Sequence, residues 1–321
     1  WSGPHFIANC ARWAFRPSSV AAIFGRRPEA GASRVTRIVY VNGAYKRYPE
    51  AAVHAEDRGF QFADAIYEVI EIRDGRLVDA TRHLARLARS LRELDIPAPM
   101  SDAALMQVIG QVIRRNRVRD GIVYMQVTRG AGPRDFALPP VGTSPTLVVL
   151  ARAQRKGWSA EQAEVGIAIK TIPDNRWGRC DIKTVMLLPA VLAKNEARSS
   201  GAKEAWFIDA HGNVTEGASS NAWIVTAAGS LVTHPLGAQI LPGVTRATVI
   251  DAAKLEGLKV EERIFALDEA FRAREAFVTS ATNIVMPVVR IDGRPVGDGK
   301  PGNFARRLRT RFHHVAEISA G

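Results

Sequence analysis

The sequence has 321 residues, of which 46% are hydrophobic and 24% charged, with a formal net charge of +12. This length and composition allow two moderate globular domains, each with its own core. No run approaches the about 18–20 apolar residues of a membrane span, so we expect a soluble, cytoplasmic protein. The two cysteines, Cys10 and Cys180, lie far apart and outside any CxxC motif, which argues against a disulfide framework or a zinc site.

The positive charge is concentrated at the two ends of the sequence. Residues 1–37 hold six arginines and one glutamate, and residues 300–321 hold five basic residues and one glutamate. No aromatic-interleaved basic groove accompanies these charges. We therefore expect a solvated surface and no nucleic-acid partner, while a basic module that binds polyanions is the alternative from a different functional class.

Residues 1–34 mix Arg, Pro, Gly, Ser and aromatic residues without periodicity. We expect a poorly ordered N-terminal extension, whose Arg-rich composition resembles an organelle transit peptide. An extended or misassigned start is the alternative. Beyond this segment we expect two domains, a small α+β domain over 35–156 and a larger α+β domain over 157–321.

The first domain is predicted to begin with strands and continue with helices. Asn-Gly and Asp-Gly turn signals predict two hairpins, within 37–48 and 65–80. Helices are predicted over 81–96 and 101–117, and strands over 121–130 and 144–153. The segment between the last two strands is rich in Gly and Pro and predicts a long loop, a place where functional residues are common.

In the second domain the predicted strands cluster rather than alternate strictly with helices. The elements are a strand over 164–172, a helix over 184–200, strands over 204–209, 221–226 and 230–235, a helix over 243–257, a strand–turn–strand unit over 275–293 and a terminal helix after Pro301. This arrangement favours an α+β fold over a doubly wound sheet.

One lysine stands in an unusual position. Lys183 is the last charge before the apolar run 184–188, behind Arg176 and Arg179. The common interpretation is a helix-start lysine whose stem lies along apolar surface. The alternative is a partly buried lysine whose cationic neighbours lower the pKa of the amine, so that it can form an imine. The local sequence does not decide between the two.

Other polar groups could serve the same chemistry. Glu216 precedes hydroxyl residues on a predicted turn, Thr245 lies in the first turn of a predicted helix, and 279–283 form a second turn with hydroxyls. Taken alone, these are an ordinary polar turn, an N-cap and a hairpin, and Arg86 is a surface arginine. Together they supply what pyridoxal phosphate requires: an amine, an acid for the ring nitrogen, and donors for the phosphate.

The chain resembles the fold-type IV aminotransferases, and within them the D-amino-acid (D-alanine) aminotransferases. The resemblance runs from about Ile38 to Phe312. It is carried by DRGFQFADAIYEVI (57–70), HLARLARSL (83–91), YMQVTRGAGPRD (124–135), RWGRCDIKTVMLLPAVLAK (176–194), NVTEGASSN (213–221), LPGVTR (241–246) and FVTSAT (277–282). RCDIK and EGxSSN are the most specific, since branched-chain relatives typically have EGxGxN in the latter place.

The resemblance implies a role for each of these residues. Lys183 would be the Schiff-base lysine and Glu216 the partner of the pyridine nitrogen. The other residues that bind pyridoxal 5'-phosphate would be Arg86, Ser220, Leu241, Val244, Thr245, Ser280, Ala281 and Thr282. The substrate-binding residues would be Tyr67, Phe136 and Arg134, the last delivered by the neighbouring subunit's loop to bind the substrate carboxylate. No metal is expected.

The chain departs from the pattern of those enzymes in its substrate pocket. Phe136 stands where they usually have a histidine, which weakens the carboxylate site or requires another polar group. Ala63 and Ala65 replace the usual glycines near Tyr67, and Ala281 replaces a threonine, so that a backbone N–H would act in its place. These changes leave the family and cofactor intact and the substrate open.

The implied fold is the two-domain α+β fold of fold-type IV, with pyridoxal phosphate in the larger domain. The implied reaction is ping-pong transamination of a D-alanine-like amino acid with a 2-oxo acid, in a homodimer with no membrane or nucleic-acid partner. Same-fold alternatives are a branched-chain L-aminotransferase, an aminodeoxychorismate lyase and an (R)-amine transaminase, the last because an amine has no carboxylate for the Phe136 region to bind. An inactive homologue is disfavoured because Lys183 and Glu216 are both present.

Overall fold

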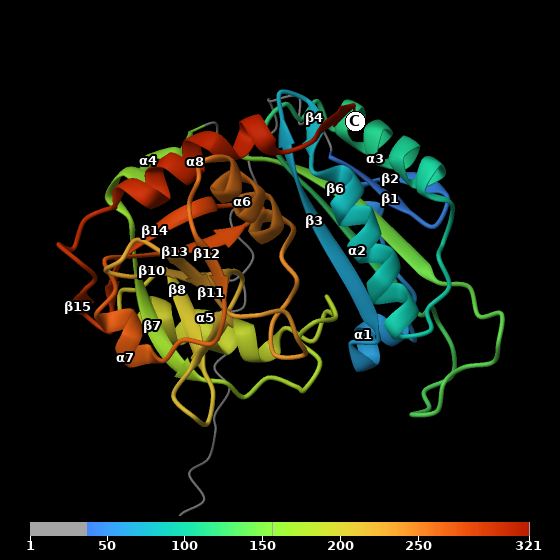
Figure 1. Cartoon of the computed structure of the whole chain (residues 1–321). Coiled ribbons are helices and arrows are strands. Elements are labelled where there is room, and N and C mark those ends of the chain that lie inside the picture. The colour runs from blue at the N-terminus through green and yellow to red at the C-terminus, as the bar shows by residue number, and fades with distance from the viewer. Residues whose placement is uncertain (1–36, 156, 321) are drawn as a thin grey trace, which may run out of the picture. The chain divides into compact units, whose positions relative to one another are not determined.

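The computed structural model describes residues 37–155 and 157–320, which form two β-sheets covered by helices (Figure 1). The N-terminal extension expected over 1–34 lies outside the described residues. The α+β class is confirmed. The division into domains at residue 156 stays a prediction. Strands within 38–153 build one sheet together with a last strand over 318–320, and strands within 167–295 build the other.

The first sheet is antiparallel throughout, in the order β16-β4-β3-β5-β6-β1-β2. Its strands are β1 (Ile38–Val41), β2 (Ala44–Arg47), β3 (Ala65–Arg73), β4 (Arg76–Val78), β5 (Gly121–Thr128), β6 (Thr146–Ala153) and β16 (Ile318–Ala320). The helices α2 (Ala80–Glu93) and α3 (Asp102–Asn116) share one core with the sheet. A 3-10 turn (Tyr48–Glu50) and α1 (Arg58–Phe62) precede β3.

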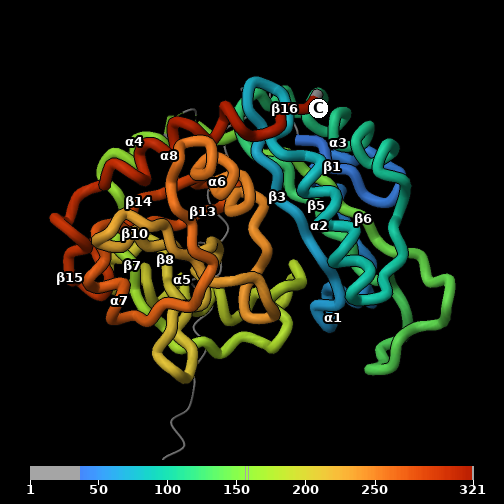
Figure 2. Tube along the Cα trace, in the orientation of Figure 1, coloured from blue at the N-terminus to red at the C-terminus, as the bar shows by residue number. Residues whose placement is uncertain are grey.

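The second sheet is mixed, in the order β12-β11-β10-β13-β14-β7-β8-β9, with β15 paired to β14. Its strands are β7 (Ile167–Pro173), β8 (Glu204–Ile208), β9 (Val214–Gly217), β10 (Asn221–Val225), β11 (Leu231–Thr233), β12 (Val260–Glu262), β13 (Glu275–Ser280), β14 (Ile284–Ile291) and β15 (Arg294–Pro295). The helices of this half are α4 (Trp158–Val165), α5 (Leu188–Ser199), α6 (Val244–Leu255), α7 (Leu267–Phe271) and α8 (Asn303–Val315) (Figure 2). No helix of the described residues is long and apolar enough to cross a membrane.

Both predicted hairpins of the first sheet form. Asn42 and Gly43 connect β1 to β2, and Asp74 and Gly75 connect β3 to β4. All four residues have positive φ, between 42° and 90°. Asn, Asp and Gly tolerate this left-handed conformation, which matches the twist of the flanking strands and explains why these dipeptides set the register.

The helix predicted over 184–200 begins later, at Leu188. The residues before it run extended beside β3, and the carbonyl of Lys183 accepts a hydrogen bond from the Tyr67 N–H at 3.0 Å. Pro189 lies in the first turn of α5, where the lack of a backbone N–H costs nothing. The start of the apolar run, at Thr184 and Val185, thus pairs with β3 as a short strand-like segment, and its last residue, Leu188, begins α5.

Glu216 lies on a strand rather than on the predicted polar turn. It belongs to β9, all four residues of which are buried. The turn itself is shorter and holds Ala218, Ser219 and Ser220. Three short helices, α1, α4 and α7, were also not predicted, because elements of five to eight residues show too little periodicity to detect.

We predict that Leu308 is a main stabilising contact of α8. Leu308 is fully buried in the core that α8 and α6 form with β13 and β14. Leu308→Ala should lower the free energy of unfolding by about 2–5 kcal/mol, because it removes apolar contacts and leaves a cavity. Leu255→Ala, at the exposed end of α6, should change it by less than about 0.5 kcal/mol. Urea unfolding measures both, and equal losses would contradict this packing.

Candidate active site

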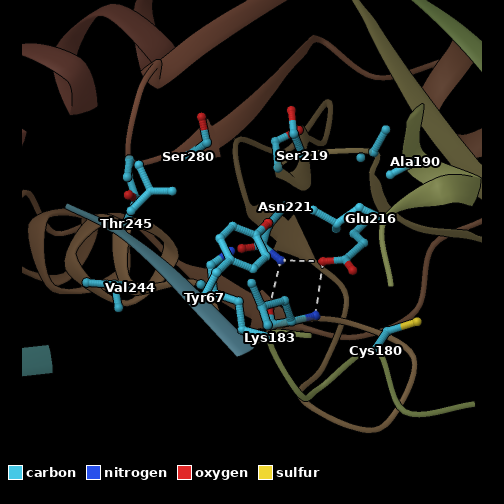
Figure 3. Close-up of a pocket in the computed structure, with 18 of the residues that line it drawn as sticks. Tyr67, Cys180, Lys183, Ala190, Glu216, Ser219, Asn221, Val244, Thr245 and Ser280 are labelled. Carbon is cyan, nitrogen blue, oxygen red and sulfur yellow. Dashed lines mark hydrogen bonds between the residues drawn. The ribbon is translucent and has the colours of Figure 1, made fainter. Parts of the chain in front are cut away.

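A cavity of about 250 Å³ is lined by residues from both sheets. Its walls come from β3, α2, the segment before α5, β9 and the turn after it, the start of α6 and the turn after β13. Figure 3 shows side chains from these elements converging, with Tyr67, Lys183, Glu216 and Asn221 close to one another. Residues that are distant in the chain thus form one site.

Lys183 is fixed in the cavity by its own backbone. In addition to the bond from Tyr67, the Val185 N–H donates to the Ala65 carbonyl at 3.1 Å, so residues 183–185 extend the first sheet. The Lys183 N–H lies 3.4 Å from the Ser90 hydroxyl. The Nζ atom lies 4.1 Å from the centre of the Tyr67 ring, which places the amine over the face of the ring. The half-buried amine therefore faces the cavity and not the outer surface.

The two arginines expected beside Lys183 have their charges balanced by carboxylates. The ion pairs are Arg176 with Asp174 and Glu216, and Arg179 with Asp181 and Glu93. The sequence left open whether these arginines act as cationic neighbours of Lys183, and in the fold each of them is paired with two carboxylates. Asp174 and Asp181 each lie two residues from the arginine that they pair with, and the fold brings Glu216 and Glu93 to the same two arginines.

Glu216 is buried, and both of its carboxylate oxygens are hydrogen-bonded. Oε1 accepts from Nη1 of Arg176, and Oε2 accepts from Nδ2 of Asn221 and from the Leu241 N–H, each at 3.0 Å. Burial raises the pKa of Glu216 to about 7, although Arg176 acts in the opposite direction. This carboxyl can therefore hold or release a proton near neutral pH.

Unused backbone donors line another side of the cavity. Among the described residues, the N–H groups of Val244 and Thr245 at the start of α6 donate no hydrogen bond, and neither do those of Ala281 and Thr282. The hydroxyls of Thr245, Ser280 and Thr282 lie beside them. A helix N-terminus with free N–H groups attracts anions. This end of the cavity is suited to a phosphate.

Arg86 enters the cavity from α2 and is held by the buried carboxylate of Glu68. Glu68 accepts from Nε and Nη2 of Arg86, both at 2.8 Å, and pairs with Nδ1 of His83 at 2.8 Å. Burial opposes its charge, but Arg86 lowers the pKa of Glu68 to about 2. Arg86 also donates from Nη1 to the Pro242 carbonyl at 3.0 Å, which leaves one N–H on each terminal nitrogen for a ligand.

The structure brings together every residue predicted to bind the cofactor. Those lining the cavity are Arg86, Lys183, Glu216, Ser220, Leu241, Val244, Thr245, Ser280, Ala281 and Thr282, together with Tyr67 from the substrate set. Arg134 and Phe136 do not line it. They are exposed on the loop between β5 and β6. The centre of the Phe62 ring lies 5.5 Å from the centre of the Phe136 ring and 5.2 Å from the Arg134 guanidinium.

Sequence reasoning missed the residues that hold the predicted ones in place. Glu68 shares the buried face of β3 with Ile66 and Ile70, so the period-two pattern alone marks it as an inward carboxylate. His83 and Arg86 lie three residues apart on one face of α2, which is the spacing for a shared partner. Asn221 lies five residues after Glu216 in the sequence, but the hydrogen bond between the two side chains follows only from the fold.

The Glu68 ion pair predicts a stability difference that depends on pH. The pKa of about 2 lies below the usual value of 4.5, so the stabilisation is present above pH 4.5 and is lost as the pH falls toward 2. Glu68→Gln should lower the free energy of unfolding by about 3 kcal/mol at pH 7, because it leaves Arg86 without its buried partner. The control Glu71→Gln removes a more exposed carboxylate from the same strand and should cost less than about 1 kcal/mol.

Urea unfolding at pH 7 and pH 3 measures both variants. The deficit of Glu68→Gln should shrink at pH 3. A deficit that is the same at both pH values would show that Glu68 is not ionised in the folded protein.

Comparison with known proteins agrees with this geometry. The family model described as amino-transferase class IV matches residues 65–291. The D-alanine aminotransferase of Staphylococcus haemolyticus is 37% identical over 280 residues, covering 87% of this chain and 98% of the relative. That of Bacillus licheniformis is 39% identical over 276 residues, covering 86% and 96%.

Solved structures give the same result. The branched-chain amino acid aminotransferase of Escherichia coli superposes with a TM-score of 0.80 at 26% identity, covering 87% of this chain and 94% of that one. The T.th. branched-chain amino acid aminotransferase, solved with pyridoxamine 5'-phosphate, has the same TM-score and identity, with coverage of 87% and 93%. The chain therefore belongs to the class IV aminotransferases, which are pyridoxal-phosphate enzymes.

Proposed function

We propose that this chain transfers the amino group of a D-amino acid of the D-alanine type to a 2-oxo acid by a ping-pong mechanism. The observation that carries the proposal is the meeting of an amine, Lys183, and a buried carboxyl, Glu216, in a cavity that also contains unused anion donors. The curated D-alanine aminotransferases support the D-amino acid, since they are 37% and 39% identical over nearly their whole length. The branched-chain enzymes share the fold at 26% identity, so a branched-chain substrate is the second candidate.

The donor set of the cavity fits pyridoxal phosphate. The unused N–H groups at the start of α6 and after β13 match a phosphate, and the free N–H groups of Arg86 add positive charge. Glu216 can pair with a ring nitrogen, and Lys183 is the amine of the cavity able to hold an aldehyde. When bound, the cofactor supplies an aldehyde that takes up an amino group and a ring that withdraws electrons from the neighbouring carbon.

Lys183 has two tasks in the proposed reaction. Its amine would hold the cofactor's aldehyde carbon until the amino group of a substrate takes its place. The freed amine would then take the proton from the substrate's α-carbon and deliver it to the carbon that had carried the aldehyde. Tyr67 keeps the amine in position, because its ring lies against Nζ. A D-amino acid is turned over when its α-hydrogen faces Nζ, and the other enantiomer presents a different group to the same base.

We further propose a homodimer in which the loop between β5 and β6 brings Arg134 to the partner's cavity. In its own chain Arg134 lies outside the cavity, on a loop that also exposes Phe136, Leu138 and Val141. Burying these apolar side chains against a second copy would favour association. Phe136 leaves the carboxylate site with one polar group fewer, which keeps an (R)-amine substrate as an alternative.

The role of Lys183 is tested by Lys183→Ala. The variant should lose the absorption band at about 400 nm that marks the cofactor bound to the lysine, and should lose activity by at least about 10³-fold. Lys254→Ala, at the exposed end of α6, is the control and should retain both. A yellow, active Lys183→Ala enzyme would rule out the assignment.

The substrate class is tested by single half-reactions. Addition of D-alanine should bleach the band of the wild-type enzyme, whereas L-leucine and (R)-1-phenylethylamine should leave it largely unchanged. Bleaching by L-leucine alone would support the branched-chain candidate, and bleaching by the amine alone would support the amine transaminase.

The dimer is tested by mixing two inactive variants. Lys183→Ala and Arg134→Ala chains, unfolded and refolded together, should regain activity, because one site of each mixed dimer then has both residues intact. Each variant refolded alone should stay inactive toward amino acids. Absence of recovery despite mixed dimers would place Arg134 outside the shared site.

A further inference from the structure

Arg176 joins two carboxylates in a line that ends in the cavity. Its Nε and Nη2 donate to the two oxygens of Asp174 at 2.9 and 2.8 Å, and its Nη1 donates to Oε1 of Glu216. The side chains of Arg176 and Glu216 are 11% and 7% exposed. The row of ion pairs Asp174–Arg176–Glu216 is thus largely shielded from water, and ionic hydrogen bonds are stronger in such a shielded place than in water.

The position of Arg176 is fixed on several sides. Nη2 also donates to the Gln239 carbonyl at 3.0 Å, and the guanidinium lies 4.4 Å from the centre of the buried Phe207 ring. Thr215 donates to Asp174 at 2.8 Å and so fixes the second carboxylate. The bidentate pair with Asp174 leaves Nη1 directed at Glu216 and at no other charged group of the described residues.

The groups that face Glu216 differ in how they can affect its charge. Arg176 and Lys183 are the cations that act on it, and the Cys180 thiol is a nearby titratable group whose pKa burial raises to about 11. Asn221 and the Leu241 N–H are neutral donors. In the proposed reaction the amine of Lys183 gains and loses protons, whereas a guanidinium stays charged. Arg176 is therefore the constant cation beside Glu216.

We propose that Arg176, held by Asp174, is a positioning residue that keeps Glu216 as a carboxylate anion, so that the proton between Glu216 and the cofactor's ring nitrogen stays on the nitrogen. This inference rests on the proposed role of Glu216. Without Arg176, burial would leave the proton on Glu216, and the ring would withdraw electrons less strongly. Because Asp174 also pairs with Arg176, the guanidinium has no unbalanced positive charge that would attract the carboxylate of a substrate.

The first test is made on the cofactor-free full-length chain and does not depend on activity. Glu216 is followed by infrared difference spectra between each protein and its own Glu216→Gln counterpart across pH. Arg176→Gln should move the titration midpoint of Glu216 upward by about one to three pH units. Arg179→Gln is the matched control, because it breaks ion pairs three residues away without contacting Glu216, and its midpoint should equal that of the wild type.

Asp174→Asn gives an independent second variant with the opposite sign. It removes a negative charge and leaves Arg176 to Glu216 alone, so the midpoint should move downward. If Arg176→Gln does not fold, this variant decides the question. An unchanged midpoint in Arg176→Gln, or an unchanged or higher one in Asp174→Asn, would overturn the proposal.

The holoenzyme supplies the second readout through pyridoxal phosphate labelled with ¹⁵N in the ring. The ¹⁵N shift should be that of a protonated nitrogen in the wild type and in Arg179→Gln, and should move toward the unprotonated value in Arg176→Gln. A wild-type chain that fails to bind the cofactor would contradict the proposed function, while the titration of the cofactor-free chain would still test the role of Arg176. Cofactor binding with the same ¹⁵N shift in wild type and Arg176→Gln would overturn this inference alone.

Discussion

The pairing of residues 183–185 with β3 is the constraint on which the site depends. It draws the chain that leads into α5 onto the first sheet, although α5 itself packs with the second. Two backbone hydrogen bonds fix the position of Lys183 before any side chain acts. The amine therefore reaches the cavity from a backbone position that is fixed, and a site built on such rigid support holds its geometry more precisely.

Two buried glutamates show how environment assigns different tasks to one residue type. Glu68 is bonded to Arg86 and His83, and its pKa is lowered to about 2, so it is a permanent anion that orients a cation. Glu216 shares Arg176 with Asp174, and burial raises its pKa to about 7. The first carboxylate orients Arg86 at the end of the cavity that we propose for the phosphate, and the second faces the place that we propose for the cofactor ring.

Most of the candidate site could be predicted from the sequence because its residues lie in short motifs that are weak when taken alone but indicate one cofactor when taken together. Lys183, Glu216 and Thr245 each stand in such a motif, and the resemblance supplied their order. Their supports were not predictable, because the contacts between Arg176 and Glu216 and between Glu68 and Arg86 join segments through the fold. In the fold, Asn-Gly and Asp-Gly turns marked the hairpins, while the start of α5 was misplaced because periodicity cannot distinguish a helix turn from a short added strand.

The central claim is that the fold presents Lys183, and no other lysine, to a pyridoxal phosphate bound between Glu216 and the start of α6. Reduction of the loaded enzyme with borohydride, followed by peptide mass spectrometry, tests it directly, because the reagent joins the cofactor permanently to the amine that holds it. The account predicts a phosphopyridoxyl group on the peptide that contains Lys183. A label on a different lysine, or none on a chain that has bound the cofactor, would contradict it.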